Sequence, residues 1–259
     1  MYRGGIMTAS ERREEILNTI NEAGSVRASE LAERLNVTQE TIRKDLIYLS
    51  NKHLLKKCHG RAQAISEFTE YSLDIRTQEN SHAKQAIANA ALQQIVDGSV
   101  VFIDAGSTMV ELAKQLSQRS SLAIITNNFS AVSKLLESGN AIYFLGGEVS
   151  GSTQATGGIW ASNELKTIKI DVAFLGTSGF QSHSGPCTKI FSDAQIKRDV
   201  ISNSNKSIVL ADRTKFSSNA IMQYADWTNI DLLITDSGIT QEERMSLEQD
   251  VDILIAESI

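Results

Sequence analysis

The sequence predicts a two-domain protein, in which a small, mainly α-helical domain precedes a larger α/β domain with a mostly parallel sheet. The chain has 259 residues, which is longer than one ordinary domain. Its first 63 residues show short helical periodicities and a net positive charge, whereas from residue 83 onward apolar, β-branched runs alternate with helical segments. We therefore expect a first domain at residues 7–63, a linker at residues 64–82 and a second domain at residues 83–259.

Composition and cysteine usage restrict the class of protein. Hydrophobic residues make up 41% and charged residues 22% of the chain, as is typical of a folded globular protein. No apolar run approaches the roughly 18 residues of a membrane span, and the N-terminal MYRGGIMTASERREE lacks the apolar core of a secretion signal. Cys58 and Cys187 are too few for a disulfide framework and lack the spacing of a zinc site. We expect a cytoplasmic protein with reduced thiols, no membrane association, no metal site and no cofactor.

Charge is distributed unevenly along the chain. Residues 1–63 hold eleven Lys/Arg against eight Asp/Glu, a net of +3, and the remainder holds 14 against 23, a net of -9. Six of the basic residues and one acid, Asp45, lie between Arg43 and Arg61. A polyanion would be attracted to the first domain and repelled by the second.

Three helices are predicted in the first domain. Ser10 is expected to cap a helix that stops at Gly24, and Ser29 to cap a short second helix. After a four-residue joint, Thr38 is expected to cap a third helix from residue 39 to about residue 51. Two short helices joined by a tight turn, with a third packed across them, form a helix-turn-helix.

The third helix and the segment after it carry the expected nucleic-acid contacts. Ile42, Leu46 and Leu49 repeat at helical spacing and should face the core, which leaves a polar face with basic residues. HLLKKCHGRAQ, residues 53–63, is expected to form a two-stranded wing that turns at Gly60. A basic run alone is more typical of a solvated surface, but the paired helices and the wing favour contacts to DNA bases and phosphates. The residues expected to contact DNA are Thr38, Gln39, Thr41, Arg43, Lys44, Lys56, Lys57, His59 and Arg61.

These residues resemble the N-terminal domain of the DeoR family of bacterial repressors. The family signature is a helix with T-I-R-x-D-L followed by L-x-R-x-H-G-G, which stands here as TIRKDL at 41–46 and LKKCHGR at 55–61. Lys57 replaces the usual arginine and keeps the charge without the bidentate geometry, and Arg61 replaces the second glycine and is expected to stiffen the turn. The resemblance implies that double-stranded operator DNA is a partner.

Seven apolar runs predict the strands of the second domain. They are SVVFIDAG, LAIITNN, AIYFLGG, DVAFLGTSG, SIVLAD, LLITDS and VDILIA, with helical segments such as MVELAKQL and SDAQIKRDVI between several of them. Continuous apolar strands that alternate with helices predict a parallel sheet covered on both faces. Ligands of such folds bind beyond the carboxyl ends of the strands.

DAGSTMVEL, residues 104–112, is the strongest candidate site in this domain. Gly106 permits a sharp turn after a buried strand, and Ser107 and Thr108 open a helix. The N–H groups of the first helical turn, the two hydroxyls and the helix dipole would bind a phosphate or another anion. Ordinary helix capping produces the same pattern, because Ser and Thr are favoured caps.

Other strand ends supply further candidates. GG at 146–147 and GTSG at 176–179 allow close approach of the backbone, and ADRTKF at 211–216 places Asp212 and Lys215 just past a strand. Lys215 would supply positive charge to a dianionic ligand. Each residue alone is equally typical of a turn or of a solvated surface; their convergence on one sheet edge favours a binding site.

This half of the chain resembles the DeoR-type sensor domain and, through it, the ribose-5-phosphate isomerase and CoA-transferase superfamily. Residues 83–116, AKQAIANAALQQIVDGSVVFIDAGSTMVELAKQL, are similar to the first motif of the isomerases, and VLADRTKF is similar to their Asp-x-Ser-Lys motif, with Thr214 in place of serine. The resemblance implies the fold of that superfamily and a phosphate site. The effector-binding residues expected on this basis are Lys84, Gly106, Ser107, Thr108, Asp212 and Lys215, with Asp104, Asn127, Gly147, Thr177, Gly179 and Lys189 toward the sugar.

One departure from the isomerases bears on catalysis. Their catalytic loop reads D-G-A-D-E, whereas the corresponding run here is LGTSG at 175–179, which contains no acid. Enediol chemistry needs a positioned base, so we expect binding without turnover and no catalytic residues.

The expected function is transcriptional regulation, with the protein acting as a repressor of a sugar-utilisation operon. A homodimer or tetramer would pair the DNA-binding domains on repeated half-sites, and the resemblance implies that a phosphorylated sugar or sugar derivative releases the DNA. One alternative is a sugar-phosphate isomerase-like enzyme or hydrolase with an N-terminal interaction module. Another is a protein-binding winged helix on a scaffold without a ligand.

Overall fold

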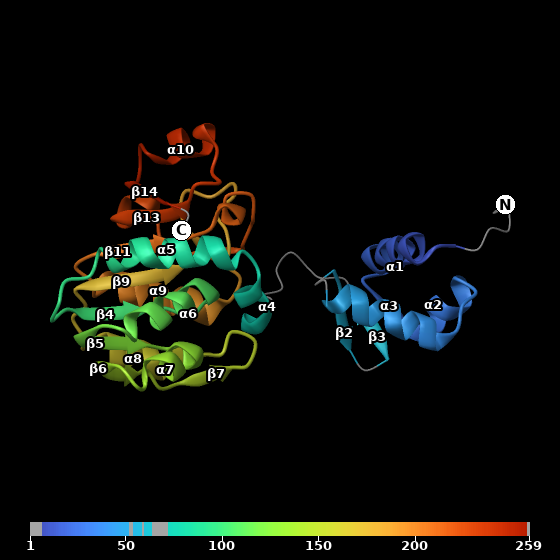
Figure 1. Ribbon diagram of the computed structural model, residues 1–259, viewed down its shortest axis with the longest axis horizontal. Coiled ribbons are helices and arrows are strands. Elements are labelled where there is room, and N and C mark those ends of the chain that lie inside the picture. Colours follow the sequence, from blue (N-terminus) through green and yellow to red (C-terminus); the bar gives the residue numbers. More distant parts are fainter. Residues whose placement is uncertain (1–6, 52–53, 59, 64–71, 258–259) are drawn as a thin grey trace. The chain divides into compact units, whose positions relative to one another are not determined.

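The computed structural model describes residues 7–51, 54–58, 60–63 and 72–257. The chain divides into two compact units, residues 1–69 and residues 70–259, both of which are drawn in Figure 1. Each unit has a buried core of its own.

The described residues of the first unit form three helices and a small antiparallel sheet of strand order β1-β3-β2. The helices are α1 (Ala9–Ala23), α2 (Ala28–Arg34) and α3 (Gln39–Asn51), and the strands are β1 (Ser25–Arg27), β2 (Lys56–Cys58) and β3 (Arg61–Gln63). The predicted helix-turn-helix and wing are confirmed. Strand β1 was not predicted, because three residues are too few to show an alternation of apolar and polar side chains.

Two helix starts differ from the predictions. Thr8, not Ser10, caps α1: its Oγ1 accepts the N–H of Glu11 at 3.3 Å, and the Glu11 carboxylate accepts the N–H of Thr8 at 2.8 Å. This reciprocal pair needs a carboxylate three residues after the cap, which Thr8 has and Ser10 lacks. Ser29 lies inside α2, whose first residue is Ala28, because the chain passes from β1 directly into the helix.

The core of the first unit is built from one face of each helix. Ile42, Leu46 and Leu49 of α3 are buried, as predicted, and the joint residue Val37 packs partly buried beside them. The other buried apolar residues of this core are Ile16, Ile20, Val26, Leu31, Ala32, Leu55 and Ala62. Each large aliphatic side chain buried in this way contributes about 1.5–3 kcal/mol to folding.

Asp45, the one acid within the basic stretch, is directed into the unit and not toward solvent. Its side chain is 2% exposed and accepts hydrogen bonds from Arg12 Nε at 2.6 Å and from Arg13 Nε at 2.8 Å. The Arg13 guanidinium also lies 3.6 Å from the centre of the Tyr48 ring. Asp45 therefore joins α1 to α3 and does not neutralise the exposed face of α3.

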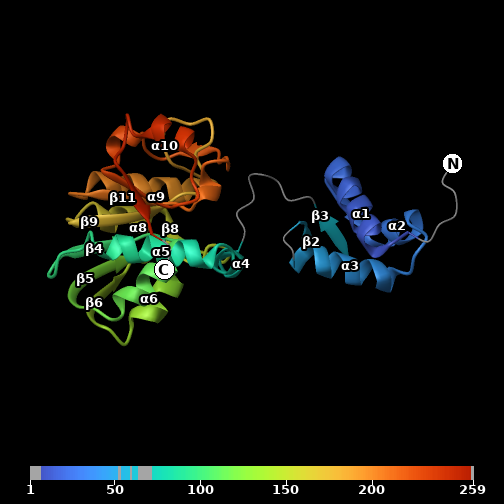
Figure 2. The ribbon, with the colours of Figure 1, turned by 45° about the horizontal axis from the view of Figure 1, so that its top comes forward.

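The second unit is organised around a seven-stranded parallel sheet of order β14-β13-β11-β9-β4-β5-β6. All seven predicted strands are confirmed, and Figure 2 shows several of them as one layer. Their bounds are β4 (Val100–Ile103), β5 (Ser120–Thr126), β6 (Gly139–Phe144), β9 (Val172–Gly176), β11 (Ser207–Leu210), β13 (Leu232–Asp236) and β14 (Ile253–Ala256). The chain leaves β4 toward β5 on one side and returns at β9 on the other, so the order reverses between β4 and β9.

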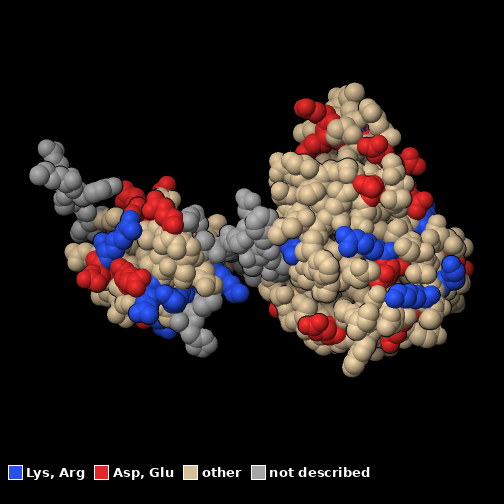
Figure 3. Space-filling model, turned by 180° about the vertical axis from the view of Figure 1, so that it is seen from behind, with Lys and Arg blue, Asp and Glu red and all other residues tan. Residues whose placement is uncertain are grey.

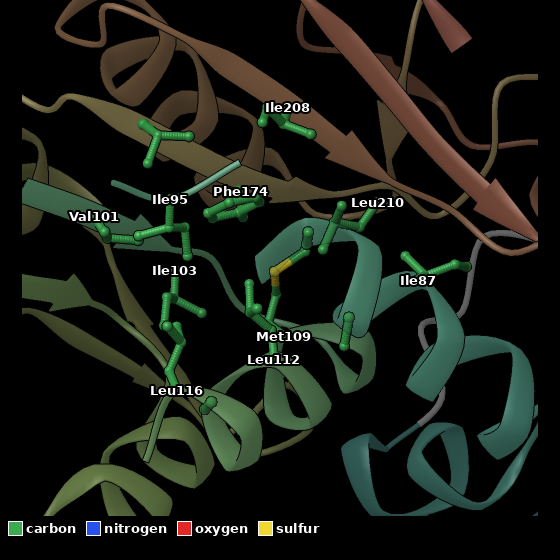
Figure 4. Packing of buried hydrophobic residues seen from close by; sticks show 14 of the residues in the cluster. Ile87, Ile95, Val101, Ile103, Met109, Leu112, Leu116, Phe174, Ile208 and Leu210 are labelled. Carbon is green, nitrogen blue, oxygen red and sulfur yellow. The ribbon is translucent and has the colours of Figure 1, made fainter. Parts of the chain in front are cut away.

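Helices cover both faces of this sheet. Val101 and Ile103 of β4 pack against one group of helices, and Phe102 between them packs against the other; Figure 4 shows the first of these clusters. The first group is α5 (Ser81–Leu92), α6 (Ser107–Leu116) and α7 (Phe129–Leu135), and the second is α8 (Gly158–Leu165) and α9 (Phe191–Ser202). Burial on both faces explains why the strands are continuously apolar.

Short elements complete the second unit around the sheet. They are α4 (Leu73–Gln78), α10 (Gln241–Leu247), the 3-10 turns η1 (Arg213–Lys215) and η2 (Trp227–Asn229), and the strand pairs β7 (Glu148–Ser150) with β8 (Ala155–Gly157) and β10 (Cys187–Thr188) with β12 (Met222–Gln223). Helix α4 lies within the predicted linker, of which residues 64–71 fall outside the described part of the chain. Leu73 of α4 is 1% exposed. No helix in the described ranges is long and apolar enough to cross a membrane.

Candidate functional site

The outer face of α3 is polar and exposed. Gln39, Arg43 and Lys44 are exposed, whereas Thr41 is half-buried. The Thr38 Oγ1 accepts the N–H of Thr41 at 3.1 Å and so caps the helix as predicted. This face presents hydrogen-bond donors and two positive charges from the first two turns of a single helix.

Arg43 is held by a local partner on the same surface. Its Nε donates to the Glu40 carboxylate at 2.8 Å, and both side chains are more than half exposed. An ion pair between exposed side chains is weak, so the guanidinium is available to a competing phosphate or base edge.

The wing presents further basic side chains. Lys56, Lys57 and Arg61 are exposed on β2 and β3, and Figure 3 shows Lys and Arg atoms at the surface of this unit. Gly60 has φ +69° and makes the turn, whereas Arg61 pairs as the first residue of β3. A glycine is therefore not required at position 61. His59, also predicted to contact DNA, lies outside the described residues.

The second unit has a cleft at the reversal point of its sheet, where ligands bind in open α/β folds. The residues after β4, β9 and β11 line it, together with α4, α5 and α9. Gly106, with φ +144°, precedes α6, and the Ser107 and Thr108 side chains that open the helix are 6% and 8% exposed. The N–H groups of the first turn of α6 have no acceptors within the helix. This end of the cleft therefore favours an anion.

Lys84 of α5 is buried at the same end. Its Nζ donates to the carbonyls of Arg76 and Glu79, the second at 2.6 Å. Burial lowers the pKa of Lys84 to about 8, while the nearby Asp212 carboxylate raises it and the Lys215 ammonium lowers it further. Lys84 therefore remains mostly charged at neutral pH, and these two groups lie close enough to affect it.

A buried ion pair lies at the cleft, between the end of β4 and α9. Asp104 is fully buried and its Oδ2 accepts from Lys197 Nζ and from the Gly176 N–H, the latter at 2.8 Å. Burial raises the pKa of Asp104, and Lys197 opposes this. Burial acts to lower the pKa of Lys197. The Asp104 and Asp193 carboxylates act more strongly in the other direction, so the pKa of Lys197 is raised. The two charges hold each other in place, and Lys197 also lines the cleft.

The cleft brings together more than half of the predicted effector-binding residues. Those that line it are Lys84, Gly106, Ser107, Thr108, Thr177, Asp212 and Lys215. Asp212 is 2% exposed and accepts the N–H of Thr214 at 3.0 Å. It is thus both the cap of η1 and part of the cleft wall.

Five predicted residues do not line this cleft. Asp104 lies behind Lys197, as described above. Gly147 and Gly179 have backbone roles: a Cβ at Gly147 would lie 2.3 Å from the Gly157 carbonyl oxygen, and one at Gly179 would lie 2.2 Å from that of Ser218. Only glycine permits these approaches.

Asn127 and Lys189 line neighbouring depressions. Asn127 is 1% exposed, its Nδ2 donates to the Thr156 carbonyl at 2.8 Å, and it faces a depression beside β7 and β8. Lys189 lines a depression that shares Arg76 and Lys215 with the main cleft. The roles of both in ligand binding stay predictions.

Several cleft residues were not predicted. Arg76, Glu79 and Asn80 come from α4 and the turn after it, a segment assigned to the linker for want of a clear period. Lys197 did leave a signal, because helical spacing places it on the same face as the buried residues Ala194 and Val200. A lysine on the apolar face of a helix needs a charged partner.

Family models match both units of the chain. The model described as the DeoR-like helix-turn-helix domain matches residues 12–68, and the model described as the DeoR C terminal sensor domain matches residues 79–237. The chain belongs to the DeoR family. Its winged unit and its sheet unit therefore correspond to the two domains of DeoR-type transcriptional regulators, and the predicted resemblance to the DeoR family is confirmed.

Relatives of this DeoR-family protein match over most of its length. The uncharacterized HTH-type transcriptional regulator YgbI of Escherichia coli K12 is 31% identical over 255 residues, 97% of this chain and 100% of that protein. The uncharacterized HTH-type transcriptional regulator YulB of Bacillus subtilis is 31% identical over 244 residues, 93% of this chain and 94% of that protein. The glycerol-3-phosphate regulon repressor of Escherichia coli K12 is 28% identical over 232 residues, 89% of this chain and 92% of that protein.

Solved structures give weaker likenesses. Ribose 5-phosphate isomerase A from Methanocaldococcus jannaschii is 20% identical, covers 53% of this chain and 55% of its own, and has a TM-score of 0.40. A Pyrococcus horikoshii translation initiation factor, eIF-2B, is 12% identical, covers 89% and 90%, and has a TM-score of 0.41. Neither likeness carries an argument about chemistry.

Proposed function

We propose that this DeoR-family protein is a cytoplasmic repressor of a sugar-utilisation operon, which binds operator DNA and releases it when a phosphorylated sugar or sugar derivative binds. Residues 7–63 form the DNA-binding domain and residues 83–259 the effector domain. Residues 64–82 connect them, and α4 within this segment packs as part of the second unit. The names of relatives support this assignment, because one is the glycerol-3-phosphate regulon repressor and another is a putative repressor of the aga operon.

The observation that carries the effector proposal is the composition of the cleft. Lys84 and Lys215 stand beside the start of α6, where Ser107 and Thr108 supply hydroxyls and the first turn supplies N–H groups. Two cations and a helix N-terminus complement a dianion, which is the charge state of a phosphate monoester at neutral pH. The hydroxyl-lined wall at Thr177, Thr188 and Thr214 accommodates the hydroxyl groups of a sugar.

DNA binding rests on α3 and the wing, with the contacts predicted from the sequence. One winged domain buries a small surface on DNA, and paired domains on repeated half-sites would raise both affinity and specificity. The effector domain has a net negative charge and adds no attraction of its own for DNA. A homodimer or homotetramer follows as the active form.

The cleft binds its ligand without converting it. The run LGTSG at the end of β9, residues 175–179, contains no acid where the isomerases carry acids. Asp104 beside it is already held by Lys197, which removes it as a free base. Purified protein incubated with pentose and hexose phosphates is therefore expected to leave them unconverted, as measured by NMR. Conversion that is lost in Asp212→Ala would show an isomerase-like enzyme instead.

Lys215→Ala is expected to weaken the response to sugar phosphates by about 10- to 100-fold, because a hydrogen bond to a charged group contributes about 1.5–3 kcal/mol. Affinity for DNA without effector should not change. The measurement is the concentration of sugar phosphate that releases a fluorescent duplex, chosen from a random-sequence pool by the wild-type protein. Lys134→Ala, which removes an exposed lysine from α7, is the matched control. A normal response in Lys215→Ala would contradict the shared phosphate site.

A further inference from the structure

Helix α4 and the turn that follows it belong to the wall of the cleft. Arg76, Glu79 and Asn80 line the cleft beside the start of α6. After β3 of the wing, which ends at Gln63, the next described element is α4, which begins at Leu73. The cleft is therefore bounded by the segment of the second unit that lies nearest in the chain to the DNA-binding unit.

Lys84 connects this segment to the anion-binding end of the cleft. Its ammonium donates to the carbonyls of Arg76 and Glu79, at the C-terminal end of α4. Carbonyl groups at a helix end lack partners within the helix, and a cation there satisfies them and opposes the helix dipole. One side chain thus caps α4 and also stands where a phosphate would bind.

Other contacts also hold α4 against the second unit: Leu73 is buried, and the helix packs beside α6. A helix of six residues is not stable in isolation, so α4 depends on its surroundings. Among the described contacts, Leu73 donates its N–H to the Ser152 carbonyl at 2.9 Å, and Gln154 Nε2 donates to Asp74 Oδ1 at 3.0 Å. Both partners lie in the turn between β7 and β8. The position of α4 on the second unit therefore depends on apolar packing and on polar bonds, and the bonds from Lys84 are polar contacts made at the cleft.

We propose that α4 is the element that converts occupancy of the cleft into a signal for the DNA-binding domain: effector binding fixes α4 against the sheet unit through Lys84 and Arg76, and so fixes the point at which the connecting chain is anchored. The proposal rests on the proposed function and specifies its regulation. It also adds Arg76 and Asn80 to the residues of the effector site.

The chemistry of lysine and arginine gives the direction of the effect. An ammonium group has three N–H donors, of which Lys84 uses two on α4, and the third remains for a ligand oxygen. Arg76 is carried by α4 itself, so a dianion that it contacts attracts the helix toward the cleft. A ligand shifts an equilibrium only by its difference in affinity for the two states, and here the docked state of α4 has more ligand contacts. A coupling of about 5- to 150-fold is the usual range for such a link.

Hydrogen exchange of the full-length protein tests this directly. The probes are inorganic phosphate and then the sugar phosphate that raises the melting temperature most. Either probe is expected to slow amide exchange in residues 72–80 at least about fivefold, together with the first turn of α6. If the melting temperature rises and the start of α6 is protected while residues 72–80 exchange as before, the proposal is wrong.

Two variants separate the contribution of α4 from that of phosphate binding. Asp74→Ala removes the bond to Gln154 at an exposed position that does not line the cleft. It should speed exchange of residues 72–80 without ligand and reduce the effect of sugar phosphate on duplex affinity. Lys84→Met should speed the same exchange and also abolish protection by phosphate. Lys215→Ala, which removes a cation outside α4 and weakens phosphate binding, should leave the ligand-free exchange unchanged.

The outcomes distinguish this inference from the proposed function. Ligand-free exchange of residues 72–80 that is the same in Lys84→Met, Asp74→Ala and the wild type would overturn the role of α4. If no phosphate compound protects the start of α6 in the wild type, the proposed function fails, and the effector role of α4 fails with it. Faster ligand-free exchange in both variants, protection of the wild type, and a smaller effect of sugar phosphate on duplex affinity in Asp74→Ala together establish the link.

Discussion

Replacement of Arg43 and Lys44 by alanine is expected to lower affinity for the selected duplex at least about 100-fold, because each contact to a base or phosphate is worth about 1–3 kcal/mol. Both side chains are exposed on the outer face of α3, whose inner face is buried. Folding and sugar-phosphate binding should be unaffected. Fluorescence anisotropy at several salt concentrations measures the effect, and the salt dependence should also become weaker.

The matched control for this pair removes the same charge from the other unit. Lys134 and Lys169 are exposed on the sheet unit and lie away from the winged domain in the sequence. Their double replacement by alanine should leave duplex affinity within about threefold, because long-range charge effects are screened at physiological salt. Equal losses in the two double variants would show that α3 does not read DNA.

Lys197→Met is expected to destabilise the sheet unit by about 3–5 kcal/mol, because it leaves the Asp104 carboxylate buried without its counter-ion. Lys197 is 2% exposed and Asp104 is fully buried. The free energy of unfolding from urea denaturation, followed by circular dichroism, measures the loss. Lys166→Met makes the same chemical change at an exposed position of the second unit and should cost little.

A second substitution provides an internal check on that result. Adding Asp104→Asn to Lys197→Met removes the isolated charge and should recover part of the lost stability. Replacing both members of a buried ion pair costs less free energy than removing one and leaving the other charged. The two residues are in contact, so their effects should not be additive. Additive losses would contradict the pairing of Lys197 with Asp104.

The overall fold was predictable because its signals are local and repeated. The run VVFI is apolar at every position and SIVL at all but its first, which is typical of strands buried on both faces, and each is one strand of the sheet. The helical spacing of Ile42, Leu46 and Leu49 likewise predicted α3 and its buried face. Helix caps were less predictable, because Thr8 and Ser10 are both good caps and a carboxylate three residues further on decides between them.

The cleft was predictable only where motif and sheet edge coincide. Gly106, Ser107 and Lys215 follow strands whose carboxyl ends must meet, so the sequence alone places them together. Arg76 reaches the cleft through the packing of α4. No periodic pattern of apolar residues in the sequence predicts that helix. The partner of Lys197 is 93 residues away in the chain. Helical spacing places this lysine on the buried face of α9, but only the topology shows that Asp104 neutralises it.

The lowered pKa of Lys84 has a consequence for how the sensor responds to alkaline conditions. With a pKa of about 8, this lysine becomes half neutral where an ordinary lysine is still charged. A doubly charged ligand favours the ammonium form, so capture of the ligand above that pH draws a proton from solution. Affinity for the ligand is therefore expected to weaken as the pH rises through about 8.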